Sequence, residues 1–64
     1  MSWYMIWPER RPLSDADVIQ WALDVIANDK ADPCITAADV AHDPVFAASL
    51  LMDAGVATFG KGRP

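Results

Sequence analysis

The sequence predicts a small α+β domain that is mostly helical, with three short helices between two extended ends. An aromatic and β-branched run at residues 3–7 favours a strand, and a shorter apolar run at 56–59 favours a second one. Between them, apolar residues recur at helical spacing, and each stretch opens on a capping residue. The N- and C-terminal segments can therefore pair into a two-stranded ribbon. The alternative is an all-α three-helix domain with extended termini, because an isolated ribbon is marginally stable.

Length and composition restrict the function as well as the fold. A chain of 64 residues makes at most one domain, here 1–64, and 53% hydrophobic residues exclude a disordered chain. Such a small domain buries only ~60% of the surface that its unfolded chain exposes. That leaves little room for a substrate cavity beside a stabilising core, so we expect no enzyme. Residues 60–64 are expected to form a flexible basic tail.

The first predicted strand has two apolar faces. Trp3, Met5 and Trp7 would share one face and residues 4 and 6 the other, because side chains alternate along a strand. Tryptophans in a small domain usually fill the core, so Trp3 and Trp7 are placed there. Pro8 ends the strand, and residues 9–12 are interpreted as a charged connector.

The first predicted helix begins at Ser14 and ends near Asn28. Ser14 suits the N-cap, and acidic residues in the first turn suit the positive end of the helix dipole. Helical spacing collects a broad apolar face from Val18, Ile19, Ala22, Val25 and Ile26. The opposite face is polar, and Trp21 lies at its border, where we expect it to reach the surface.

Two further helices are predicted after a loop. Thr36 and Asp39 have the form of a capping box for a short helix. Asp43 caps the third helix with Pro44 in its first turn, and Gly55 ends it. Residues 46–54 are apolar apart from one serine and one aspartate, so this helix needs cover on several sides. We therefore expect a partner protein or self-association as a homo-oligomer.

The charge of the chain indicates which partner it would accept. The net charge is -4, and the region from residue 15 to 53 holds eight aspartates and one lysine. This region should repel nucleic acid and attract a protein with a basic surface. Two groups of residues at helical spacing are candidates for the contact. The predicted partner-binding residues are Asp17, Trp21 and Asp24 on the first helix, and Phe46, Leu50 and Asp53 on the third.

Residues 36–63 also have the outline of a helix-turn-helix followed by a wing. Residues 36–42 would be its first helix and 44–54 its recognition helix. A recognition helix needs Arg, Lys, Asn or Gln directed at base edges, whereas this one offers Ser49 and Asp53. Because of this outline, a small helix-turn-helix-like transcriptional regulator is kept as the alternative function. Because the base-reading side chains are missing, direct nucleic acid binding is not expected.

The sequence contains little that would indicate a metal site, a cofactor or a disulfide. Cys34, His42 and nearby aspartates match no zinc spacing, because a second cysteine or histidine is missing, so we expect no metal and no cofactor. A single cysteine allows no internal disulfide, which favours the cytoplasm. We also expect no signal peptide and no membrane segment.

The expected function is that of a small acidic protein–protein interaction module acting by binding and occlusion. An inhibitor from a phage or mobile element, directed at a host nucleic-acid-handling protein, would have this size and charge. That expectation is an analogy from size and charge. The alternatives are the helix-turn-helix-like regulator and an accessory subunit of a larger complex.

Overall fold

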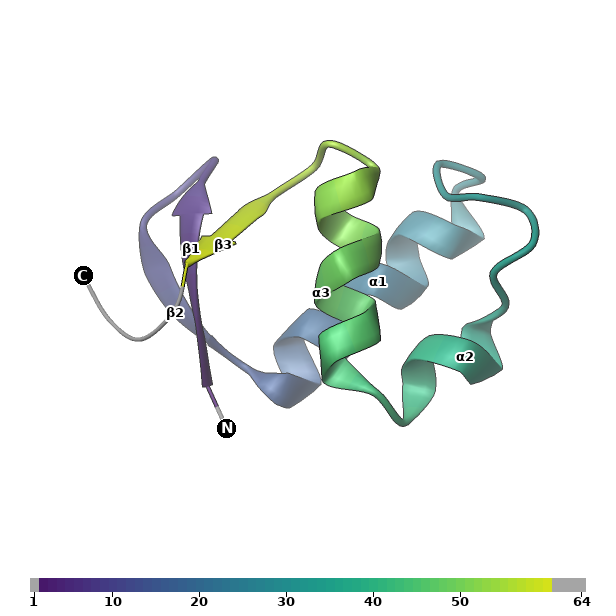
Figure 1. The fold of residues 1–64 in the computed structure, drawn as a ribbon, viewed down its shortest axis with the longest axis horizontal. Helices are drawn as coiled ribbons and strands as arrows, with labels where there is room; N and C mark the ends of the chain where they lie inside the picture. Colours follow the sequence, from purple (N-terminus) through teal and green to yellow (C-terminus); the bar gives the residue numbers. More distant parts are fainter. Residues whose placement is uncertain (1, 61–64) are drawn as a thin grey trace.

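The structure, a computed structural model, describes residues 2–60 of the chain. Three strands lie on one side of the molecule and three helices on the other (Figure 1). The fold is therefore of the mixed α+β class, as predicted. In chain order the elements are β1 (Ser2–Trp7), β2 (Arg11–Ser14), α1 (Asp15–Ala27), α2 (Ala37–Ala41), α3 (Pro44–Asp53) and β3 (Thr58–Gly60).

The strands form an antiparallel sheet in the order β2-β1-β3. β1 pairs with β3, so the two ends of the chain meet as the sequence predicts. The two-stranded ribbon is imprecise, however, because the predicted connector contributes a third strand opposite residues 2–5. Leu13 explains this, since it pairs with Trp3 and is buried in the core. Pro12 is tolerated because β2 is an edge strand.

Side-chain alternation along β1 stops near its end. Met5 is 1% exposed, whereas Trp7 is 54% exposed, which contradicts the expected core position of Trp7. Met5 pairs with Phe59 and Trp7 with Thr58, so β1 carries one extra residue at this point. Such a bulge interrupts the ladder and re-aims the side chains beside it. Trp3, before the bulge, remains half-buried against the core.

Local capping determines where α1 begins and ends. The Ser14 hydroxyl accepts the N–H of Asp17 at 3.2 Å, and the Asp17 carboxylate accepts the N–H of Ser14 at 3.2 Å. This reciprocal pair satisfies two donors that a helix start would otherwise leave open. Asn28 is the C-cap. The predicted bounds of this helix are confirmed, and its buried residues are Val18, Ala22 and Val25.

The third helix is mostly covered by the domain itself. Asp43 caps α3 by accepting the N–H groups of residues 45 and 46, both at 3.1 Å. Its buried side chains pack in one core with those of α1 and the sheet, while Val45 and Met52 remain 55% and 41% exposed. The part of α3 that would need cover from a partner is therefore limited to the exposed strip formed by Val45 and Met52. The buried residues of α3 are Ala47, Ala48, Leu50 and Leu51.

The C-terminal segment departs from its prediction at one residue. The sequence predicts Gly60 in the flexible tail, but Gly60 belongs to β3 and pairs with Tyr4. A Cβ at Gly60 would lie 2.7 Å from Cδ1 of Ile6, so β3 passes close beneath that side chain. The rest of the predicted tail, 61–64, lies outside the described residues. Within residues 2–60, no helix has the length and apolar character needed to cross a membrane.

Candidate partner-binding site

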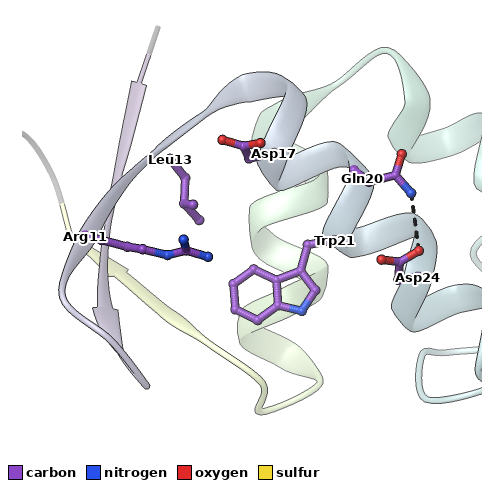
Figure 2. Close-up of a pocket in the computed structure, with 6 residues that line it drawn as sticks. All are labelled: Arg11, Leu13, Asp17, Gln20, Trp21 and Asp24. Atoms are coloured by element: carbon purple, nitrogen blue, oxygen red, sulfur yellow. Dashed lines mark hydrogen bonds between the residues drawn. The ribbon is translucent and has the colours of Figure 1, made fainter.

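A hollow of about 380 Å³ lies between β2 and α1. Figure 2 shows its two walls: the side chains of one wall come from β2, and those of the other come from the first three turns of α1. Three of the six predicted partner-binding residues, Asp17, Trp21 and Asp24, line it together. The complete lining consists of Arg11, Leu13, Asp17, Gln20, Trp21 and Asp24.

Helical spacing and a sharp change of direction bring these residues together. Trp21 lies four residues after Asp17 and three before Asp24, so the indole and both carboxylates share one face of α1. Ser14 is both the last residue of β2 and the N-cap of α1. The chain therefore turns directly from strand to helix, and the β2 residue Arg11 lies opposite this face of α1 (Figure 2).

Trp21 packs inward and lines the hollow at the same time. Its ring meets the Phe59 ring edge-on, with centroids 6.4 Å apart and an interplanar angle of 80°. Phe59 makes a similar contact with Trp3, at 6.0 Å and 65°. Trp21 therefore reaches the surface as predicted, but only part of its side chain is exposed. Contact with β3 holds the indole in place and limits its rotamers, which suits a rigid aromatic contact.

Both carboxylates are exposed and also have local partners. Asp17 belongs to the capping box of α1, so it has a structural role besides its position in the hollow. Asp24 accepts a hydrogen bond from the Gln20 amide at 3.2 Å. Neither carboxylate is in an ion pair that the structure shows among residues 2–60. Their negative charge is thus directed to solvent and to the hollow.

The β2 side of the hollow was not predicted from the sequence. Arg11 extends from this strand toward the Trp21 indole (Figure 2). Its Nε lies 3.2 Å from Oε1 of Glu9, and the two side chains are 58% and 66% exposed. The sequence alone places Arg11 in a charged connector. Its position depends on the pairing of β2 with β1, which no local signal in this segment indicates.

The second predicted group does not form one surface patch. Phe46 is half-buried and Asp53 is exposed, but Leu50 is only 3% exposed and belongs to the core. This burial contradicts the prediction that Leu50 contacts a partner. Leu50 and Asp53 instead line a second hollow of about 280 Å³, between the end of α3 and the loop after α1. The exposed apolar residues of α3 are Val45 and Met52.

Two of the residues considered for a metal site, Cys34 and Asp39, take part in local hydrogen bonds. Asp39 accepts hydrogen bonds from the N–H and hydroxyl of Thr36, at 2.9 and 3.1 Å. Cys34 is exposed, and its N–H donates to Asp32 at 2.9 Å. In the described part of the chain, no group of three or more His, Cys, Asp or Glu residues is arranged to hold a metal ion.

Comparison with known proteins found no matching family model, no matching curated protein and no matching solved structure. The function is therefore inferred from the chemistry of the hollow and from the charge of the chain.

Proposed function

We propose that the chain is a small acidic protein–protein interaction module that binds and occludes a basic surface of a partner protein. The observation that supports this most directly is the α1 face on which the exposed Asp17 and Asp24 carboxylates flank the Trp21 indole. Carboxylates of this kind accelerate the encounter with a cationic surface and orient it. A half-buried tryptophan beside them supplies the apolar contact typical of interface hot spots.

Occlusion of a nucleic-acid-binding surface is the finer part of the proposal. The net charge is -4, and eight aspartates lie between residues 15 and 53. A protein that handles nucleic acid carries a basic surface for phosphates, and these carboxylates would compete for it. An inhibitor encoded by a phage or mobile element and acting in the cytoplasm of its host would use this chemistry. The single cysteine, which allows no internal disulfide, supports that location.

Binding, and not catalysis, is the activity that we infer for the hollow. Its six lining residues include no histidine, cysteine, serine or lysine. Nucleophilic and general acid–base catalysis most often uses such groups, placed within hydrogen-bond reach of one another. The carboxylates of Asp17 and Asp24 are instead engaged in helix-surface hydrogen bonds. This arrangement suits recognition of a surface.

The test compares two charge-matched double variants as baits in extracts of the native host. Asp17→Asn with Asp24→Asn removes two charges at the hollow and keeps an oxygen that can accept the capping hydrogen bond of Ser14. Asp29→Asn with Asp32→Asn removes two charges at exposed positions outside the hollow. A genuine partner should be recovered by the wild type and by the second variant, and lost with the first.

The recovered protein is then purified and tested for nucleic acid binding with and without the chain. The proposal expects binding to fall as the chain is added, and to fall less with Asp17→Asn plus Asp24→Asn. A partner that both variants recover equally would exclude the α1 face. A partner that binds through this face but keeps its nucleic acid affinity would exclude occlusion and favour an accessory subunit.

A further inference from the structure

Arg11 lines the hollow between β2 and α1 and places a guanidinium group at its edge. Figure 2 shows the Arg11 side chain directed toward the Trp21 indole, with the Asp17 carboxylate above them and the Asp24 carboxylate beyond the indole on α1. A planar cation of this size therefore fits against this wall of α1. The hollow measures about 380 Å³ with Arg11 in place, so a second guanidinium can enter it, and repulsion between the two cations then favours movement of Arg11 into solvent.

Resting on the function proposed above, we propose that this hollow binds one arginine side chain of the partner, and that Arg11 is the internal group that it displaces. The chemistry of the lining selects a guanidinium. A guanidinium is planar, stacks on an indole, and offers several N–H donors in a fixed plane to carboxylates. In residues 2–60 the hydrogen bonds of the two carboxylates use Oδ2 of Asp17 and Oδ1 of Asp24. The other oxygen of each can accept from the ligand.

Arg11 is held weakly enough to be displaced. Its ion pair with Glu9 joins two side chains that are 58% and 66% exposed. Ion pairs between exposed side chains contribute little to stability, because both charges are well solvated when apart. Moving the Arg11 head group into solvent therefore removes no buried interaction. It also removes a positive charge that repels the incoming cation.

Lysine and anionic ligands suit the hollow less well. A lysine ammonium is a compact, strongly hydrated charge without a plane to lie on the indole. A phosphate would face two carboxylates and only one guanidinium among the lining residues. The expected order of affinity is therefore an arginine peptide, then a lysine peptide, with a peptide carrying neutral citrulline last.

The experiment titrates three short peptides, identical except for arginine, lysine or citrulline at the centre, into the full ¹⁵N-labelled chain at low salt. The indole N–H signals in the NMR spectrum are assigned with single Trp→Phe variants. The arginine peptide should shift the Trp21 signal and the α1 amides in a saturable way. Its affinity should exceed that of the lysine peptide by about threefold, the scale of an exposed cation–π contact.

Two matched arginine variants test the displacement. Arg11→Gln should bind the arginine peptide more tightly, by roughly fivefold, because a unit charge ~4 Å away in water changes binding by about that factor. Arg10→Gln makes the same charge change at an exposed neighbour outside the hollow, and its affinity should stay near that of the wild type. The dispersion of the amide signals shows that each variant is folded.

The outcomes separate this inference from the proposed function. Equal affinities for the arginine and lysine peptides, with shifts at Trp21, would overturn the arginine site and still support binding of a basic surface. Shifts that avoid α1 for both cationic peptides would overturn both proposals. Equal gains in Arg11→Gln and Arg10→Gln would overturn the role of Arg11, since only the net charge would then matter.

Discussion

Asp29 and Gly55 occupy the same position in two identical helix endings. Each follows the C-cap residue of its helix, α1 or α3, and each has a positive φ, 57° for Asp29 and 75° for Gly55. In each ending, the N–H of the positive-φ residue donates to the carbonyl oxygen three residues earlier. The N–H of the following residue donates to the carbonyl oxygen five residues before it, and all four N···O distances are 3.1 Å. This is the Schellman pattern, in which glycine is the preferred residue.

Asp29→Gly is therefore expected to stabilise the protein. An L-residue in the left-handed region suffers crowding of its Cβ, which glycine lacks. We expect a gain of about 1 kcal/mol, partly offset by the larger freedom of glycine in the unfolded chain, and a Tm higher by roughly 4 °C. Thermal unfolding followed by circular dichroism measures this. Asp29→Ala makes the same charge change without the backbone freedom, so it should not reproduce the gain.

The reverse change at Gly55 tests the same geometry. A Cβ added there would meet no atom within 4 Å, so any loss in Gly55→Ala comes from the backbone conformation alone. We expect a loss of about 1 kcal/mol in the free energy of unfolding, measured with urea. A stability equal to that of the wild type would contradict the positive φ at this position.

Neighbouring residues of α3 should differ sharply in their effect on stability. Leu50 and Leu51 are 3% and 0% exposed, whereas Met52 is 41% exposed. Truncating a buried leucine to alanine costs ~2–5 kcal/mol, which approaches the ~3–5 kcal/mol that so small a core supplies. Leu51→Ala should thus be largely unfolded at 25 °C by circular dichroism. Met52→Ala should stay within about 0.5 kcal/mol of the wild type, and the milder Leu51→Val should lie between them.

A hydrogen bond between Trp3 and Asp15 joins the sheet to the start of α1. The Trp3 indole N–H donates to Oδ1 of Asp15 at 2.9 Å, in a partly buried position. Trp3→Phe removes the donor, and we expect a loss of about 1 kcal/mol in urea unfolding. Trp7→Phe is the control, because Trp7 is 54% exposed. Equal losses in the two variants would show that the hydrogen bond contributes nothing beyond ring size.

Features that depend on neighbouring residues could be predicted from the sequence. The caps at Ser14 and Asp43 and the stop at Gly55 follow from hydrogen bonds within three residues of each position. The same holds for part of the site, since the spacing of Asp17, Trp21 and Asp24 places them on one face of α1 whatever packs against it.

Features that depend on distant pairing could not be predicted. β2 contains Arg11 and Pro12, so its strand character arises only from its pairing with β1. The exposure of Trp7 follows from a bulge opposite β3, for the same reason. In α3 the apolar residues surround the axis, so the pattern does not indicate which side faces α1. The sequence therefore predicts Leu50 as a partner contact, although the fold buries it.

Self-association is expected to depend on the end of β1 more than on α3. Trp7 and Ile6 are adjacent and 54% and 44% exposed, and an exposed tryptophan is a typical interface anchor. Sedimentation equilibrium should show an apparent mass that rises with concentration. Ile6→Lys with Trp7→Lys should abolish this rise, and Val45→Lys with Met52→Lys on α3 should retain it. A constant monomer mass for the wild type across the concentration range would contradict self-association.

Duplex DNA should not bind at physiological salt. If α3 were a recognition helix, its exposed side chains would have to read bases, yet Val45, Met52 and Asp53 bring no cation or amide. Weak binding at low salt through basic residues such as Arg10 is expected to disappear near 0.15 M, because phosphate contacts are screened and compete with ions. Fluorescence anisotropy of a labelled duplex, measured at both salt concentrations, tests this. Sequence-specific binding at micromolar or lower concentration would favour the transcriptional regulator, and Arg10→Gln would then be the first contact to examine.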